Sequence, residues 1–139
     1  MAYTDETLSA IYDRTSGYCH ICGEKLAFTN YAKPGKRGAW EVEHSVARAN
    51  GGTGRLNELY AACIPCNREK RDGSTRTARA RNGRTRAPLS REKRGAAKTH
   101  NALAGGAAGA VLGGRFFGPP GALIGGLIGA AIGKSAKVD

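Results

Sequence analysis

The spacing of apolar side chains predicts a helix close to the N-terminus. Within residues 4–16, side chains that can pack together recur at helical intervals, at Leu8, Ile11, Tyr12 and Thr15. Thr4 can accept a hydrogen bond at the start of such a helix, and Gly17 suits its C-terminal end. We therefore expect one helix to precede the rest of the fold.

Two short strands and a second helix are predicted further along. Residues 39–43 alternate apolar with acidic side chains, as a half-buried strand does, and residues 59–62 could form a second strand. The glycines of residues 50–54 indicate a loop between them, and residues 64–71 are expected to form a helix. This order of strand, loop, strand and helix predicts a small α+β domain.

The composition changes twice after this segment. Residues 74–100 contain almost no large apolar side chains and cannot build a core, so they predict a basic flexible linker. From residue 101 the chain is rich in glycine and alanine. The expected organisation is therefore a folded domain at 1–73, the linker at 74–100 and a separate tail at 101–139.

Glycines recur every four residues in this tail, at Gly105, Gly109 and Gly113 and again at Gly121, Gly125, Gly129 and Gly133. That spacing places glycine along one face of a helix, where a second backbone can approach closely. Pro119 and Pro120 separate the two sets and turn the chain. The pattern predicts a helical hairpin, and it resembles the glycine-zipper segments of small bacterial membrane-associated or pore-forming proteins.

The length of the tail leaves its role open. Each uninterrupted half has about thirteen residues and reaches about 20 Å as a helix, which is short of a hydrocarbon core of about 30 Å. Association with a membrane, self-association and a partly disordered low-complexity tail are all compatible with residues 101–139.

Four cysteines form two pairs, Cys19 with Cys22 and Cys63 with Cys66. The N-terminus has neither the basic nor the apolar region of a secretory signal, so a reducing cytoplasm is the expected location. In that setting paired CxxC motifs indicate metal ligands rather than disulfides. Four thiolates complete a tetrahedral site, so we expect a structural Zn²⁺. His20 lies inside the first pair and could replace a cysteine, but it is expected to be an exposed neighbour.

The charge distribution predicts contact with a polyanion. The chain has 22 Lys and Arg against 11 Asp and Glu, a net charge of +11, and most of the excess lies in residues 67–100. A solvated linker is the alternative interpretation of this stretch. The side chains expected to contact nucleic acid are Arg68, Lys70, Arg71, Arg76, Arg79 and Arg81. Trp40 is expected to pack in the core rather than to stack on a base.

A candidate reaction centre lies between the cysteine pairs. Hydrolysis of a phosphodiester requires a hard cation held by oxygen ligands, a base that works near neutral pH and positive groups for the polyanion. Glu43 and Asn67 can supply the cation ligands, and His44 can supply the base. In a regular strand Glu43 and His44 point to opposite faces, so a shared site requires the strand to end or bulge there.

The order of these motifs resembles the HNH endonuclease family, the ββα-metal nucleases. The resemblance covers residues 17–72 and is carried by CxxC, then WEVEH, NGG, LNEL and CxxCNREK. It is closest to the zinc-stapled branch of the family. It implies a ββα-metal core with a structural four-cysteine zinc, an N-terminal helix before it, and the basic linker and Gly/Ala-rich hairpin after it.

The resemblance also implies a role for four residues. His44 matches the general base, Glu43 the metal-binding acid before it, Asn57 the residue that ties the loop and orients His44, and Asn67 the last metal ligand. The implied ion is a single Mg²⁺ or Mn²⁺. The sequence departs from the family where Glu43 stands for the more frequent Asp, where Asn67 stands for a frequent His, and where Ala47 stands for a common Pro.

The expected function is therefore hydrolysis of DNA in the cytoplasm of a bacterial or phage-infected cell. The expected substrate is double-stranded DNA. Two alternatives remain from the sequence. One is a zinc-ribbon module that binds nucleic acid without cutting it. The other is an effector that associates with a membrane through residues 101–139 and carries a nuclease head.

Overall fold

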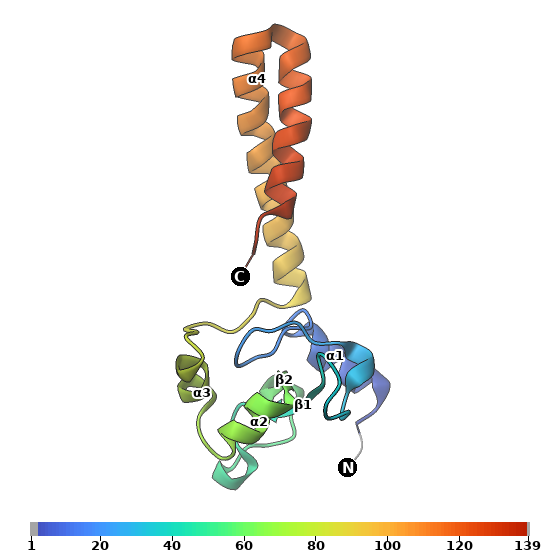
Figure 1. Ribbon diagram of the computed structural model, residues 1–139, viewed down its shortest axis with the longest axis vertical. Helices are drawn as coiled ribbons and strands as arrows, with labels where there is room; N and C mark the ends of the chain where they lie inside the picture. The colour runs from blue at the N-terminus through green and yellow to red at the C-terminus, as the bar shows by residue number, and fades with distance from the viewer. Residues whose placement is uncertain (1–2, 139) are drawn as a thin grey trace. The chain divides into compact units, whose positions relative to one another are not determined.

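The computed structural model describes residues 3–138, which form two compact units that divide after Arg91. Figure 1 shows their elements. The first unit contains α1 (Asp5–Asp13), β1 (Trp40–His44), β2 (Leu59–Cys63), α2 (Ile64–Lys70) and α3 (Thr75–Arg81), with short 3-10 turns at Phe28–Asn30, Arg48–Asn50 and Leu56–Glu58. The second unit consists of α4 (Arg91–Ser135), which is kinked, and the residues that follow it. The predicted small α+β fold is confirmed.

Helix α1 forms as the sequence predicts. The Thr4 side chain accepts a hydrogen bond from the Thr7 backbone N–H, and Asp5 and Glu6 lie in the first turn, where the helix dipole favours negative charge. Leu8 and Ile11 are buried against the rest of the unit. The amphipathic face therefore anchors α1 to the core.

Strands β1 and β2 form an antiparallel hairpin whose pairing runs without interruption from Trp40 opposite Cys63 to His44 opposite Leu59. Helix α2 starts directly after β2, with Pro65 in its first turn, where the missing N–H costs nothing. The structure therefore has the expected order of strand, strand and helix. Strand β1 contains no bulge between Trp40 and His44. Its two acidic side chains, Glu41 and Glu43, therefore point to the same face of the hairpin.

Trp40 occupies the centre of the core and has no exposed surface. The rings of Tyr12, Phe28 and Tyr31 lie around it, with centroids 4.9–6.2 Å from its own. Its indole Nε1 donates to the Phe28 carbonyl oxygen at 3.2 Å. The expectation that Trp40 packs inside rather than stacking on a base is confirmed.

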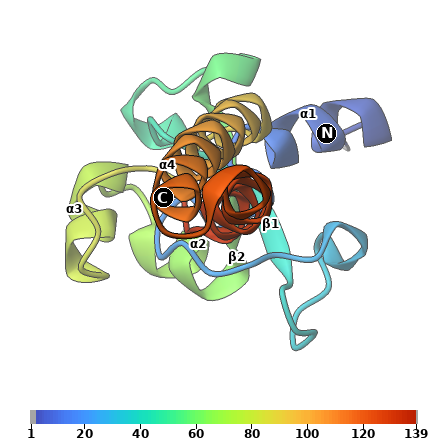
Figure 2. The same cartoon turned by 90° about the horizontal axis from the view of Figure 1, so that it is seen from above.

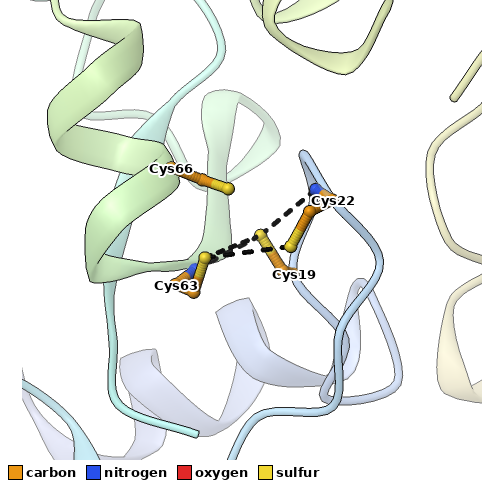
Figure 3. A group of neighbouring side chains, drawn as sticks. All are labelled: Cys19, Cys22, Cys63 and Cys66. Atoms are coloured by element: carbon orange, nitrogen blue, oxygen red, sulfur yellow. Dashed lines mark hydrogen bonds between the residues drawn. The ribbon is translucent and has the colours of Figure 1, made fainter. Parts of the chain in front are cut away.

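The four cysteines come together beside this core, and Figure 3 shows their sulfur atoms facing one another. All four Sγ atoms lie within 4.8 Å of one another. The Cys63 Sγ is 3.7 Å from that of Cys19 and 3.8 Å from that of Cys22. Tetrahedral Zn²⁺ with Zn–S bonds of about 2.3 Å needs sulfurs about 3.8 Å apart, so this donor set fits zinc.

Backbone donors also prepare the cluster for thiolates. The Cys19 Sγ accepts from the N–H groups of Ile21, Cys22 and Cys63. The thiols of Cys22 and Cys63 and these backbone donors hold the pKa of Cys19 well below the usual value for a thiol. The cluster joins the loop after α1 to the end of β2 and the start of α2.

Helix α3 departs from the prediction that residues 74–100 form a flexible linker. Ser74 caps the helix by accepting from the Thr77 N–H, and Thr75 and Ala78 are buried. Further on, the Ser16 hydroxyl donates to the Leu89 carbonyl oxygen. The first unit therefore extends to Arg91. Small side chains and backbone groups make these contacts, so the lack of large apolar residues did not prevent packing.

The second unit is the predicted helical hairpin. Gly118, with φ of 66° and ψ of −160°, breaks α4 next to Pro119 and Pro120. Figures 1 and 2 show the two arms running antiparallel and side by side. Glycines face glycines across the pair, at Gly105 and Gly129, Gly109 and Gly125, and Gly113 and Gly121. A methyl group on Gly109 would overlap the Gly125 carbonyl oxygen, so the spacing of the arms requires glycine.

Removing zinc should unfold the first unit. Structural zinc contributes about 10–16 kcal/mol in small metal-stapled domains, which exceeds a typical net stability of about 5–15 kcal/mol. We expect a purified protein to hold one zinc per chain, and Cys66→Ser or a strong chelator to abolish the cooperative thermal transition of this unit. Zinc restored to the chelated wild type should bring the transition back. An unchanged Tm in metal-free protein would contradict a structural zinc.

Candidate functional site

A pocket of about 360 Å³ lies along β1 and brings two of the predicted site residues together. Its lining consists of Tyr3, Tyr31, Glu41, Val42, His44, Arg48, Gly54 and Asn67. His44 comes from the end of β1 and Asn67 from α2. The acid that joins them in this lining is Glu41, whereas Glu43 is not part of it.

His44 is held by its backbone and left free at one ring nitrogen. Its carbonyl oxygen accepts from Lys70 Nζ at 3.0 Å, and it pairs with Leu59 across the hairpin. Its Nε2 is covered and has no hydrogen-bond partner within residues 3–138. A covered polar atom without a partner is costly, so this nitrogen has the capacity for one further hydrogen bond.

The surroundings of His44 favour its neutral form. Burial lowers the pKa of His44, and the positive charges of Arg48 and Lys70 lower it further, although Glu43 and Glu58 act in the opposite direction. An imidazole with a depressed pKa is unprotonated at neutral pH. It can therefore accept a proton, as the predicted general base must.

Glu43 lies inside the protein, with no exposed surface. One carboxylate oxygen accepts from the Thr75 hydroxyl at 2.7 Å and lies 3.3 Å from Lys70 Nζ, and the other lies 2.9 Å from His20 Nδ1. Burial alone would raise the pKa of Glu43, but these donors hold it below its usual value. The carboxylate is therefore ionised and already paired.

Glu43 is absent from the pocket because its contacts with Lys70, Thr75 and His20 enclose it inside the protein. The sequence required a bulge or an end of the strand for Glu43 and His44 to share a site, and β1 contains neither before His44. Glu41 and Glu43 lie on one face because side chains alternate along a strand. Helix α2 covers that face, with Asn67 contacting Glu41 and Lys70, about one turn later, contacting Glu43.

Glu41 and Asn67 form the polar pair of the pocket. Asn67 Nδ2 donates to Glu41 Oε2 at 3.1 Å. Arg68 Nη2 donates to the other oxygen, Oε1, at 2.9 Å, and the Arg68 side chain remains 62% exposed. Sequence reasoning did not select Glu41. Strand alternation could not have found it, because alternation places Glu41 and Glu43 on the same face; the burial of Glu43 and the contact of Asn67 with Glu41 distinguish the two acids.

His20 is buried, which corrects the expectation of an exposed neighbour of the cysteines. It is 2% exposed, and its ring stacks on Tyr60 with centroids 3.8 Å apart. Its Nδ1 faces the Glu43 carboxylate and its Nε2 lies 3.1 Å from Arg79 Nη2. A carboxylate only accepts and a guanidinium only donates, so the ring is the neutral tautomer protonated at Nδ1. Burial, the largest effect, lowers the pKa of His20 and supports that assignment.

Asn57 lies at the surface, in the 3-10 turn before β2. Within residues 3–138 its side chain makes no hydrogen bond, and its carbonyl oxygen accepts from Arg14. The neighbouring Glu58 holds the loop before β2 in place through hydrogen bonds instead. Its carboxylate accepts from the Thr53 N–H and hydroxyl, and its carbonyl oxygen accepts from the Ser45 N–H beside His44.

The six basic residues expected to contact nucleic acid divide into two groups. Lys70 and Arg79 turn inward, to Glu43 and to His20, so they hold the domain together. The other four, Arg68, Arg71, Arg76 and Arg81, are exposed on or beside α2 and α3. Those four are available to a phosphate backbone.

Comparisons with known proteins agree with the motif order. The family model described as HNH endonuclease matches residues 19–73. The comparisons with curated proteins and with solved structures gave no match. The matched segment contains both cysteine pairs, both strands and α2. Residues 19–73 therefore match the HNH endonuclease family, and this segment contains the four-cysteine cluster.

Proposed function

We propose that this protein is a metal-dependent endonuclease that hydrolyses phosphodiester bonds in DNA. The observation that carries the proposal is the pocket whose lining includes His44 together with the hydrogen-bonded pair of Glu41 and Asn67. Members of the HNH endonuclease family are typically phosphodiester hydrolases. A base and oxygen ligands for a hard cation in one pocket suit that reaction.

The protein's own residues supply the proton transfer. Because its pKa is lowered, the His44 imidazole is neutral at physiological pH and can accept a proton from the attacking water. Lys70 holds the His44 backbone, and Glu58 holds the backbone of Ser45, so the imidazole is fixed at the strand end. A bound Mg²⁺ or Mn²⁺ would neutralise charge on the scissile phosphate and on the leaving oxygen.

Exposed basic side chains after α2 suit the binding of a DNA backbone. Arg71, Arg76 and Arg81 are exposed on the stretch that follows α2, within a chain of net charge +11. Such side chains bind the phosphate backbone and contribute little sequence selectivity. A protein that bound DNA through them without cutting it would be the zinc-ribbon alternative.

The hairpin supports a second function, attachment of the nuclease to a membrane. Because the glycines pack against one another, the large apolar side chains face outward, and Leu127 and Phe117 are 74% and 78% exposed. Counted as a whole across its kink, α4 is long and apolar enough to cross a membrane by length and composition. Positive charges lie near both ends of each arm, with Arg115 near the turn and Lys98, Lys134 and Lys137 near the open end.

Replacing His44 should abolish DNA cleavage. We expect the wild type to nick or linearise plasmid DNA with added Mg²⁺ or Mn²⁺ and not with EDTA, and His44→Ala to be slower by about 10²–10⁴-fold. The matched control is His100→Ala, because His100 is an exposed histidine of the second unit. Agarose gels over time give both rates.

Two results would contradict the proposal. Cleavage by His44→Ala at the wild-type rate would remove His44 from the reaction. DNA binding without cleavage by any of the proteins, with either ion, would leave the non-catalytic zinc-ribbon module.

The pH dependence should reflect the positive neighbour of His44. Because burial and Arg48 lower its pKa, cleavage should stay active below pH 6.5 and decline only at lower pH. Arg48→Gln removes one of these charges, so the acidic limb of the rate profile should move to higher pH at saturating DNA. An unmoved limb would show that His44 does not set it.

The hairpin should carry the protein onto lipid vesicles. With neutral phosphatidylcholine vesicles in high salt, which suppress charge attraction, we expect the full chain to float with the lipid. Leu123→Glu with Leu127→Glu should release it, because charge on the lipid-facing surface is costly. The matched control places two glutamates at exposed Thr29 and Thr85. Protein that stays soluble and forms oligomers by light scattering would assign the apolar surface to self-association.

A further inference from the structure

We propose that Glu41, and not Glu43, is the acidic ligand of the catalytic divalent ion, with Asn67 as its partner. The inference rests on the proposed nuclease function and names the carboxylate that this function uses. It places the acid two positions earlier on β1 than the resemblance to the HNH family implies. Three features of the structure support it: the spacing of donors, the access of water and the balance of charge.

The spacing of Glu41 and Asn67 suits one ion. Mg²⁺ binds oxygen at about 2.0–2.1 Å in octahedral geometry, so two adjacent ligands lie about 3.0 Å apart. The Glu41 Oε2 and the terminal amide atom of Asn67 are 3.1 Å apart. Turning the Asn67 amide by half a turn exchanges Nδ2 for Oδ1 and presents an oxygen at the same place. No backbone movement is needed for the pair to become two ligands.

Access of water separates the two acids. Mg²⁺ keeps several water ligands when proteins bind it, so its site has to open to solvent. Glu41 is partly exposed and lines the pocket with His44 and Asn67. Glu43 is 0% exposed and does not line that pocket. A hydrated ion can therefore reach Glu41 but has no route to Glu43 in this fold.

The charged groups around the two acids also favour Glu41 as the ion ligand. Both oxygens of Glu43 face donors, and the Lys70 ammonium, itself only 3% exposed, lies 3.3 Å away. A divalent cation there would meet a fixed positive charge and displace buried hydrogen bonds. Glu41 has Arg68 on one oxygen only, and that side chain is 62% exposed, so it can move aside at little cost.

Glu43 then acts as a positioning residue. It holds His20 from the cysteine loop, Lys70 from α2 and Thr75 from α3. Lys70 in turn donates to the His44 carbonyl oxygen. Loss of Glu43 should therefore disturb the packing around His44 without removing an ion ligand.

The experiment measures ion binding directly, on the full zinc-loaded chain without DNA. Free Mn²⁺ is followed by electron paramagnetic resonance during titration of wild type, Glu41→Gln, Glu43→Gln and Glu69→Gln. Glu69→Gln is the matched control, because Glu69 is an exposed acid of α2, two positions after Asn67, that does not line the pocket. Thermal unfolding of each protein shows whether the fold is retained.

We expect Glu41→Gln to weaken Mn²⁺ binding about tenfold or more with an unchanged Tm, and Glu69→Gln to change neither. Glu43→Gln should lower the Tm and leave Mn²⁺ affinity close to wild type. If Glu43→Gln does not fold, Thr75→Val, which removes one donor to Glu43, takes its place and should also keep Mn²⁺ affinity.

Wild-type affinity in Glu41→Gln, or loss of binding confined to Glu43→Gln, would overturn the assignment. A wild type that binds no Mn²⁺ would overturn it as well. The proposed function fails separately: a protein that binds Mn²⁺ through Glu41 and does not cut plasmid DNA keeps the metal site and loses the enzyme.

Discussion

A carboxylate without access to water has to be paired with donors, and in this domain the donors to Glu43 come from three separate segments. His20 lies in the first cysteine loop, Lys70 ends α2 and Thr75 starts α3. Leaving a buried charge unpaired costs several kcal/mol, so each segment is fixed where its donor meets Glu43. The zinc-binding loop, the helix of the ββα core and the segment after it are thus organised around one side chain.

Much of this fold could be predicted from local patterns. The alternation around Trp40, the capping at Thr4 and the turn at Pro119–Pro120 are local signals, and the structure contains the elements that they predict. The cysteine pairs needed only their spacing, since two short turns can direct four sulfurs to one point. The predictions of these features agree with the structure because interactions within short segments determine them.

The details of the site depend on long-range contacts, which sequence patterns do not contain. Glu43 is kept out of the pocket by Lys70 and Thr75, which reach it from later segments, and the burial of His20 depends on Arg79 and Tyr60 meeting it from distant segments. Ser74 and Ala78 show the same limit. A cap and a methyl group are enough to hold α3 in place, although the composition of this stretch is typical of a linker.

The ligands of each proposed metal site determine which metal that site prefers. Four thiolates are soft ligands and fill all positions of a tetrahedral ion, so this cluster suits zinc and leaves no position for substrate. A carboxylate and an amide are hard ligands and leave positions open for water and phosphate, so the proposed Glu41–Asn67 pair would select Mg²⁺ or Mn²⁺. On this proposal the ion used for cutting could leave and return while zinc keeps the domain folded, because the two metals would be held by different ligands.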